Sequence, residues 1–92
     1  MTKILFVCHG NICRSPMAEF VMKKIVKDAG MENDFVIESA AVSSEEIGND
    51  VHPGTKEKLT QMNVPFAKRR ARKITPADYD YFDLLIGMDV QN

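Results

Sequence analysis

The sequence has no apolar run near the roughly 20 residues that cross a membrane, and it has almost no net charge. Its 12 basic and 13 acidic residues leave a net charge of −1, so no overall field draws the chain to nucleic acid or to a membrane surface. The first residues, MTKILFVC, are too short an apolar run and wrongly flanked for a signal peptide. These absences exclude a membrane-spanning segment and favour one small globular domain.

Cysteine is also scarce, with one residue at position 8 and one at position 13. In a chain without an export signal, this pattern favours a cytoplasmic location and thiol chemistry over structural disulfides. A bridge across so short a loop would stabilise the fold little. Two interpretations of Cys13 stay open. It packs under the loop as a small apolar residue, or it is a resolving thiol that traps oxidised Cys8 as a reversible disulfide.

The apolar pattern predicts alternating strands and helices over a single domain of residues 1–92. Strands are expected at residues 4–7, 35–40 and 83–88, and helices at residues 16–29, 53–63 and from Thr75 onward. This order indicates an α/β fold, an open parallel sheet with helices on both faces. Ligands bind such sheets at the carboxyl ends of strands, where Cys8 is expected to lie.

Some side chains can be placed within these predicted elements. In the second helix, Leu59 and Met62 are expected to face inward, and Asp89 is placed to cap a further helix. Residues 68–73 hold five of the twelve basic residues, which indicates either a solvated connection or a rim that attracts anionic substrate. Nucleic-acid binding is disfavoured by the overall charge.

The most informative stretch is residues 4–19, ILFVCHGNICRSPMAE, which runs from an apolar strand into a helix. The positive end of a helix dipole and free backbone N–H groups favour bound anions at such a junction. The same field favours the thiolate of Cys8, which is the reactive form of the side chain. The sequence therefore predicts an anion site with a nucleophile in its floor.

The spacing within this loop suits a phosphoryl group. Five residues between Cys8 and Arg14 are enough to wrap backbone N–H groups around three oxygens. Gly10 and Asn11 are expected to supply backbone angles that most residues avoid. Arg14 offers a planar fork for two oxygens at once, and the Ser15 hydroxyl is expected to donate to the sulfur of Cys8.

Residues 7–16, VCHGNICRSP, with Ala18 and Glu19 following, closely resemble the signature of low-molecular-weight protein-tyrosine phosphatases. Further segments also fit that family's pattern, so the resemblance covers nearly the whole chain. They are residues 39–41, 47–49, 74–75, 78–79 and 87–89. The resemblance implies the family's three-layer α/β fold and hydrolysis of phosphate monoesters without metal or cofactor. It implies phosphotyrosine-containing proteins or small aryl phosphates as substrates, and inorganic phosphate or another oxyanion as ligand.

The resemblance also implies roles for individual residues. Cys8 attacks phosphorus to give a phosphocysteine, which water hydrolyses, while Arg14 and the loop amides hold the transferring oxygens. Ser15 assists the thiolate, and Asn11 and Ser39 keep the loop in shape through hydrogen bonds. The remaining phosphate-loop residues are His9, Gly10, Ile12 and Cys13.

The sequence departs from the family's pattern in its last part. Members carry an Asp-Pro pair near the C-terminus, whose aspartate protonates the leaving phenolate, and this chain has no Asp-Pro and lacks the family's last strand and helix. We expect a partial form of a longer enzyme, or a chain completed by another copy through domain exchange. Loss of a general acid typically costs about 10²–10⁴-fold in rate. The nearest acids by type are Asp50, His52 and Asp89.

Individual residues argue for or against the alternative functions. Arsenate reductases of similar architecture need further cysteines, and none follows Cys13. Protein-arginine phosphatases tend to have threonine where Ile12 stands, and a branched apolar side chain suits an aryl group better. Glu45 stands where the family often has an aromatic wall, and His9 is expected at the site entrance as a specificity residue. An inactive phosphate-binding module is the alternative outside enzymes.

Overall fold

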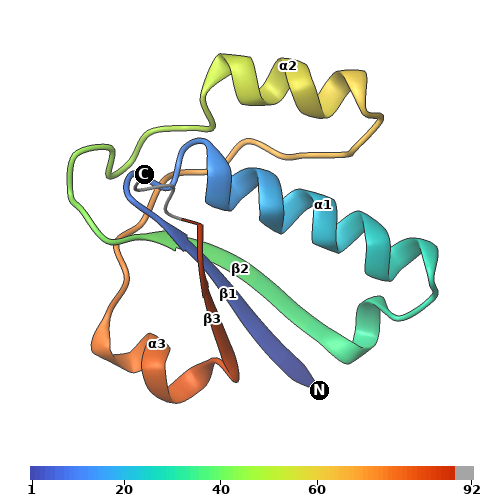
Figure 1. The fold of residues 1–92 in the computed structure, drawn as a ribbon, viewed down its shortest axis with the longest axis horizontal. Coiled ribbons are helices and arrows are strands. Elements are labelled where there is room, and N and C mark those ends of the chain that lie inside the picture. Colours follow the sequence, from blue (N-terminus) through green and yellow to red (C-terminus); the bar gives the residue numbers. More distant parts are fainter. Residues whose placement is uncertain (89–92) are drawn as a thin grey trace.

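A computed structural model of the chain describes residues 1–88 as a small parallel sheet with helices packed around it (Figure 1). The elements in chain order are β1 (Thr2–Cys8), α1 (Arg14–Asp28), η1 (Glu32–Asp34), β2 (Phe35–Ala41), α2 (Pro53–Gln61), α3 (Pro76–Tyr81) and β3 (Leu84–Gly87). This order confirms the predicted alternation of strands and helices. Asp89, with its predicted helix cap, lies outside the described residues.

The three strands are parallel in the order β2-β1-β3, so β1 is the central strand. Ile4 lies opposite Ile37 on one side and opposite Leu84 on the other. From β1 the chain passes first to β2 at one side and later to β3 at the other. The carboxyl end of β1, where Cys8 lies, is therefore the point at which the strand order reverses, as predicted.

Both faces of the sheet are covered, which confirms the predicted three-layer α/β architecture. One face packs against α1 through Val26, and the other packs against the segment that contains α3 through Phe82. Helix α2 packs on the outer side of α1, where Phe20 and Leu59 are buried together. The buried residues of β1 alternate between the two faces: Ile4 and Phe6 on the first, Leu5 and Val7 on the second.

Two predicted helix details are wrong. Helix α1 begins at Arg14, two residues before the predicted start at Pro16. Helix α2 ends at Gln61, and Met62 is 43% exposed instead of facing inward. The reason is that Asn63 has a φ of 57°, which turns the chain and brings Val64 into the core in place of Met62.

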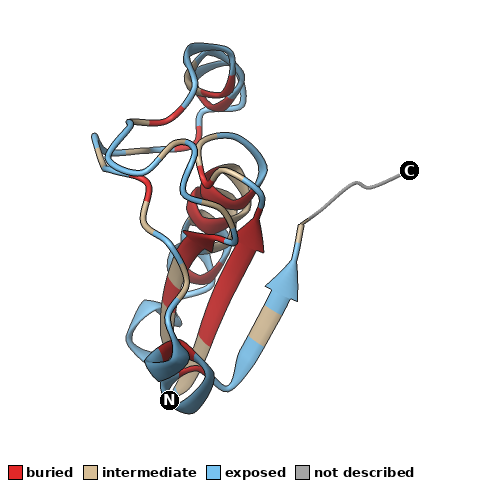
Figure 2. Cartoon of the chain, turned by 90° about the vertical axis from the view of Figure 1, so that its left-hand side faces the viewer, coloured by how far each residue is buried: buried red, intermediate tan, exposed pale blue. Residues whose placement is uncertain are grey.

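Strand β3 differs from β1 in burial, as Figure 2 shows. Leu84 is 49% exposed and Ile86 is 38% exposed, while every residue from Ile4 to Cys8 is buried. Within residues 1–88, β3 is an edge strand and presents an apolar surface. Over the same residues, no helix has the length and apolar character to cross a membrane.

Candidate active site

The sulfur of Cys8 lies buried at the junction of β1 and the loop that leads to α1. It is 2.9 Å from the hydroxyl oxygen of Ser15, in the first turn of α1. The backbone N–H of Asn11 donates to the same sulfur over 3.2 Å. Because Ser15 accepts a hydrogen bond from the side-chain amide of Asn11 at 2.8 Å, its own hydrogen is free to point at the sulfur. Two donors directed at one sulfur suit an anionic thiolate.

Asn11 shapes the loop, and Gly10 does not act in the way the sequence indicated. Asn11 has a φ of 58° and is fully buried, so it adopts the left-handed conformation expected of it. Gly10 is absent from the residues with positive φ in the described chain, so the prediction of a special backbone angle there is wrong. A Cβ at Gly10 would lie 3.1 Å from Cγ of Glu46, so the glycine instead leaves room for that side chain.

The segment after β2 ties down the loop through backbone atoms. The N–H of Val42 donates to the carbonyl of Cys8 at 3.0 Å, and the N–H of His52 donates to the carbonyl of Ile12 at 2.7 Å. The hydroxyl of Ser43 donates to the carbonyl of His9 at 2.9 Å. Three carbonyls of the loop are thus bound by the segment after β2, which fixes the path of the loop.

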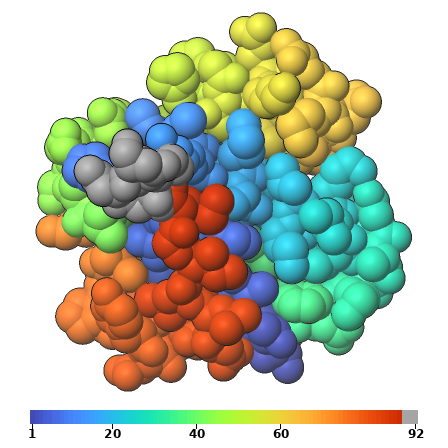
Figure 3. All heavy atoms as spheres, viewed as in Figure 1, coloured from blue at the N-terminus to red at the C-terminus, as the bar shows by residue number. Residues whose placement is uncertain are grey.

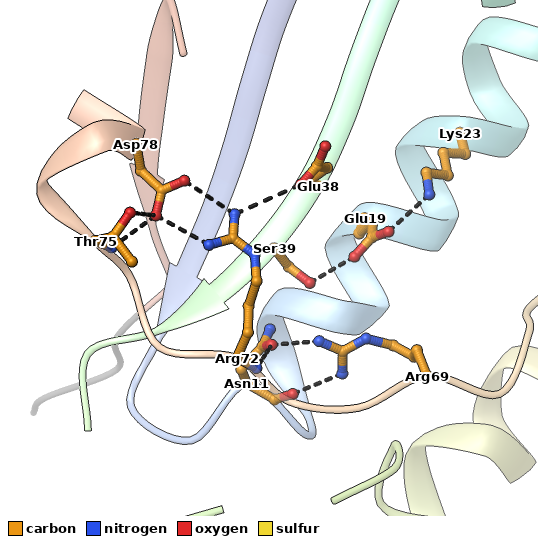
Figure 4. Close-up of polar contacts among 9 residues, drawn as sticks. All are labelled: Asn11, Glu19, Lys23, Glu38, Ser39, Arg69, Arg72, Thr75 and Asp78. Atoms are coloured by element: carbon orange, nitrogen blue, oxygen red, sulfur yellow. Dashed lines mark hydrogen bonds and ion pairs between the residues drawn. The ribbon is translucent and has the colours of Figure 1, made fainter. Parts of the chain in front are cut away.

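Arg69 also supports the loop (Figure 4). Its guanidinium donates to the carbonyl of Asn11 at 2.8 Å and also to the side-chain oxygen of Asn11. The backbone N–H of Arg72 donates to that same side-chain oxygen at 3.2 Å. Burial lowers the pKa of the Arg69 guanidinium from its ordinary value, while the nearby carboxylates of Glu19 and Asp50 oppose that change.

Neither predicted account of the basic run 68–73 describes these two arginines. Arg69 and Arg72 are half-buried and form internal bonds, so they are neither a solvated connection nor a rim for substrate. The two terminal nitrogens of the Arg72 guanidinium donate to the carboxylate of Asp78 at 3.0 and 3.1 Å. One of these nitrogens also lies 3.5 Å from a carboxylate oxygen of Glu38. This Arg72 contact, together with Thr75, holds the pKa of Asp78 below its usual value.

Cys13 and Arg14, at the N-terminus of α1, have exposed side chains. The interpretation of Cys13 as a residue packed under the loop is therefore wrong. Cys13 accepts a hydrogen bond from the buried hydroxyl of Thr55 at 3.1 Å. Cys8 and Cys13 are both free thiols. His9 is exposed, and its Nε2 lies 2.5 Å from the carboxylate of Glu45, which joins the loop to the segment after β2.

Ser39 does not join the network around Asn11 that the resemblance implied. Its hydroxyl donates to Glu19 at 2.5 Å, and the other oxygen of Glu19 lies 2.7 Å from the ammonium group of Lys23 (Figure 4). Ser39 is therefore connected to α1 and supports the loop only through the helix. Its position opposite Phe6, two residues before Cys8, explains why it cannot be assigned from the sequence: the register of two strands decides its neighbour.

Asp50 and His52, two of the three acids offered by the sequence, form structural contacts, and Asp89 lies outside the described residues. Asp50 accepts hydrogen bonds from Lys56 at 2.6 Å and from the N–H of Arg69 at 3.1 Å. These bonds hold the pKa of Asp50 well below its usual range, so it carries no proton at neutral pH. The Nδ1 atom of His52 accepts from the N–H of Gly54 at 3.0 Å and caps α2.

Little in the sequence indicated the supporting residues. Arg69 lay in a visible basic run, but nothing separated it from Lys68 or Arg70. Glu19 was part of the recognised signature without a role, and the contact between Thr55 and Cys13 joins residues 42 positions apart. Over residues 1–88, no cluster of three or more histidine, cysteine, aspartate or glutamate side chains could hold a metal ion.

Comparison with known proteins places this geometry in one family. The sequence model of the low molecular weight phosphotyrosine protein phosphatases matches residues 3–92. The chain is 41% identical over 92 residues to the low molecular weight protein-tyrosine-phosphatase YfkJ of Bacillus subtilis, a match that covers 100% of this chain and 59% of the relative.

Two crystal structures share the fold. The low molecular weight protein tyrosine phosphatase SP-PTP of Streptococcus pyogenes has a TM-score of 0.90 and 47% identity, with 97% of this chain and 57% of that chain covered. A protein tyrosine phosphatase of Entamoeba histolytica with Hepes in the active site has a TM-score of 0.92 and 32% identity, with 100% and 58% covered.

The α/β fold described above is what this chain shares with these structures. The chain belongs to the low molecular weight phosphotyrosine protein phosphatase family. It spans somewhat more than half the length of the curated relatives it matches.

Proposed function

We propose that this chain carries the nucleophile and phosphate loop of a phosphatase that hydrolyses phosphate monoesters, with phosphotyrosine in proteins or a small aryl phosphate as substrate. The observation that carries the proposal is the position of the Cys8 sulfur, buried at a strand end with two hydrogen-bond donors directed at it. Residues 1–92 would then be part of a single phosphatase domain, acting in the cytoplasm.

The reaction would proceed in two displacements at phosphorus. The thiolate of Cys8 attacks, an S–P bond forms, and the P–O bond to the aryl group breaks, so that the aryl oxide leaves with the electron pair and takes up a proton. Water then attacks the phosphocysteine, the S–P bond breaks, and inorganic phosphate leaves while the thiolate returns. Ser15 would stabilise the sulfur whenever it is anionic, before attack and after release.

The charge of the transferring group would be held by Arg14 and by the loop. The exposed Arg14 side chain at the first residue of α1 is free to swing over a bound phosphoryl group, whose oxygens match its planar fork. Backbone N–H groups of the loop other than that of Asn11, which donates to the Cys8 sulfur, would supply the remaining donors. The Hepes found in the Entamoeba histolytica active site supports an oxyanion as ligand of this loop.

The relatives' names favour a tyrosine phosphatase over the alternatives of an arginine phosphatase, an arsenate reductase or an inactive phosphate-binding module. Ile12 adds a branched apolar surface beside the loop, which suits a phenyl ring. Asp50 cannot donate a proton to the leaving oxygen, because its carboxyl group is ionised at neutral pH. We therefore expect the chain to favour substrates whose leaving group needs no proton.

The test compares p-nitrophenyl phosphate with phosphotyrosine, whose leaving phenolate is the stronger base. The 92-residue chain should turn over the first substrate and be slower on the second by about 10²-fold or more, the effect of a missing acid. Cys8→Ser should abolish turnover while inorganic phosphate still binds, and acid-quenched wild type should carry phosphate on Cys8.

Cys13→Ser, a change of the other thiol in the same loop, is the matched control and should keep most of the activity. Turnover by Cys8→Ser comparable to wild type would reject the nucleophile. If the wild-type chain binds phosphate but turns over neither substrate, the enzyme hypothesis is rejected and the chain is a phosphate-binding module.

A further inference from the structure

A groove of about 340 Å³ lies between α1 and the segment that follows α2, and it contains no residue of the loop 8–15. In Figure 3 the cyan surface of α1 meets the yellow surface of α2 and its following segment. The aromatic rings of Phe20 and Phe66 line the groove, with centroids 6.3 Å apart and planes at 61°. Phe20 is buried and Phe66 half-buried, so the groove has a fixed floor and an accessible ring.

Every charged side chain that lines this groove is a lysine: Lys23, Lys24 and Lys27. The ammonium of Lys23 lies 5.7 Å from the centroid of the Phe20 ring, so a positive charge stands directly beside the aromatic floor. Lys24 is paired with Asp28 at 2.6 Å. Among the described residues, Lys27 forms neither a side-chain hydrogen bond nor an ion pair, and its charge is available.

Lys23 is also paired, since its ammonium lies 2.7 Å from a carboxylate oxygen of Glu19, so the uncompensated charge at the groove is that of Lys27. The other oxygen of Glu19 accepts a hydrogen bond from the hydroxyl of Ser39 at 2.5 Å (Figure 4). A neighbouring hollow of about 400 Å³ shares Lys23 and Lys27 but also contains the carboxylate of Glu32. An anion is therefore better accommodated in the first groove, where no acidic side chain lines the surface.

We propose that this groove binds a small aromatic anion, such as an aryl carboxylate, with its ring against Phe20 and Phe66 and its charge beside Lys27. The volume lies within the roughly 300–1,000 Å³ typical of small-molecule sites. Apolar lining fixes the ring, and the lysines supply the polar partners that orient it. Because none of these residues belongs to the loop 8–15, the proposal stands independently of phosphatase activity.

The test uses 2-naphthoate as probe, with the 92-residue chain in saturating inorganic phosphate so that the loop 8–15 is occupied. Backbone amide signals in NMR spectra should shift for residues 23–27 and for Phe66 and Ala67 as the probe is added. The neutral 2-naphthamide should bind about fivefold more weakly, and 2-naphthylmethylammonium more weakly still, since each exposed charge contact contributes modestly.

Two variants and one control complete the test. Lys27→Glu should weaken binding of 2-naphthoate about fivefold, and Phe66→Ala about tenfold. Lys58→Glu is the matched control, because Lys58 also lies in the last turn of a helix but outside the groove, and it should change binding less than twofold.

If the Phe66→Ala variant is unfolded, the Lys27→Glu variant alone tests the proposal. Lys27 is exposed, so its substitution leaves the core unchanged. Equal affinity for the three naphthalene probes would overturn the proposal. So would shifts confined to other regions, or no shift up to the solubility limit of the probe.

Discussion

Arg69 holds Asn11 by both its carbonyl and its side-chain oxygen, across 58 positions of sequence. Asn11 in turn bonds to Ser15, and Ser15 and the Asn11 N–H contact the sulfur of Cys8. One arginine outside the loop is thereby connected to the proposed nucleophile through a short series of hydrogen bonds. Arg69 therefore holds the residue of the loop that has a positive φ.

We expect Arg69→Ala to lower kcat about tenfold or more and to change KM less, because the variant loop must be ordered during each reaction cycle. Arg69→Lys should recover only part of the loss, since an ammonium cannot reach both oxygens of Asn11 in one plane. The measurement is steady-state kinetics on p-nitrophenyl phosphate, together with the rate at which iodoacetamide alkylates Cys8.

Arg70→Ala is the matched control for Arg69→Ala, because Arg70 is the exposed neighbour and should leave both readouts unchanged. A purely structural role for Arg69 predicts a lower melting temperature with normal kinetics and alkylation in the folded protein. That result would contradict a positioning role.

Asn11 is expected to tolerate glycine better than alanine. Either substitution removes the side-chain bonds to Ser15 and Arg69, but alanine at a φ of 58° adds a left-handed strain of about 1–2 kcal/mol. Part of that difference returns through the greater freedom of glycine in the unfolded chain. Urea unfolding should show Asn11→Gly more stable than Asn11→Ala by up to about 1 kcal/mol. Equal or reversed stabilities would mean that the loop relaxes out of this conformation.

The paired contact of Asp78 with Arg72 should make stability depend on pH in the acid range. Arg72 lowers the pKa of Asp78 from 3.8, so the carboxylate stabilises the fold fully above that value, and the contribution is lost as the pH falls through the lower folded pKa. At pH 7, Asp78→Asn should reduce the free energy of unfolding by about 2 kcal/mol.

Urea titrations from pH 7 to strong acid check this expectation, and the gap between wild type and Asp78→Asn should narrow below about pH 4. Asp80→Asn, in the same helix but exposed, should run parallel to wild type throughout. A constant gap between wild type and Asp78→Asn would show that the carboxylate's charge contributes nothing.

Cys13 is expected to make oxidation of Cys8 reversible. Peroxide converts the Cys8 thiolate to a sulfenic acid, and attack by the Cys13 thiol then forms the S–S bond and releases water. A thiol reductant should restore phosphatase activity of wild type after peroxide treatment, with a two-hydrogen mass loss in the oxidised form. Cys13→Ala should be inactivated without recovery. Recovery that is the same in both proteins would remove the resolving role.

The sequence was sufficient for the order of elements because each strand and helix is coded locally. The run Ile4 to Val7 and the apolar spacing from Met17 to Val26 each predict one element without knowledge of the rest. It was less accurate where a boundary depends on a turn, as at Met62, whose exposure follows from the positive φ of Asn63.

By itself, the sequence determined the loop: a cysteine after an apolar strand, five residues, then arginine and serine opening a helix, all within one short stretch whose geometry is local. Only the tertiary structure decided what holds that loop. Arg69, Thr55 and Ser39 lie far from it along the chain, and their partners are set by the register of parallel strands and by the path of the segment after α2. Hydrogen bonds act over about 3 Å, and folding alone brings such distant residues that close.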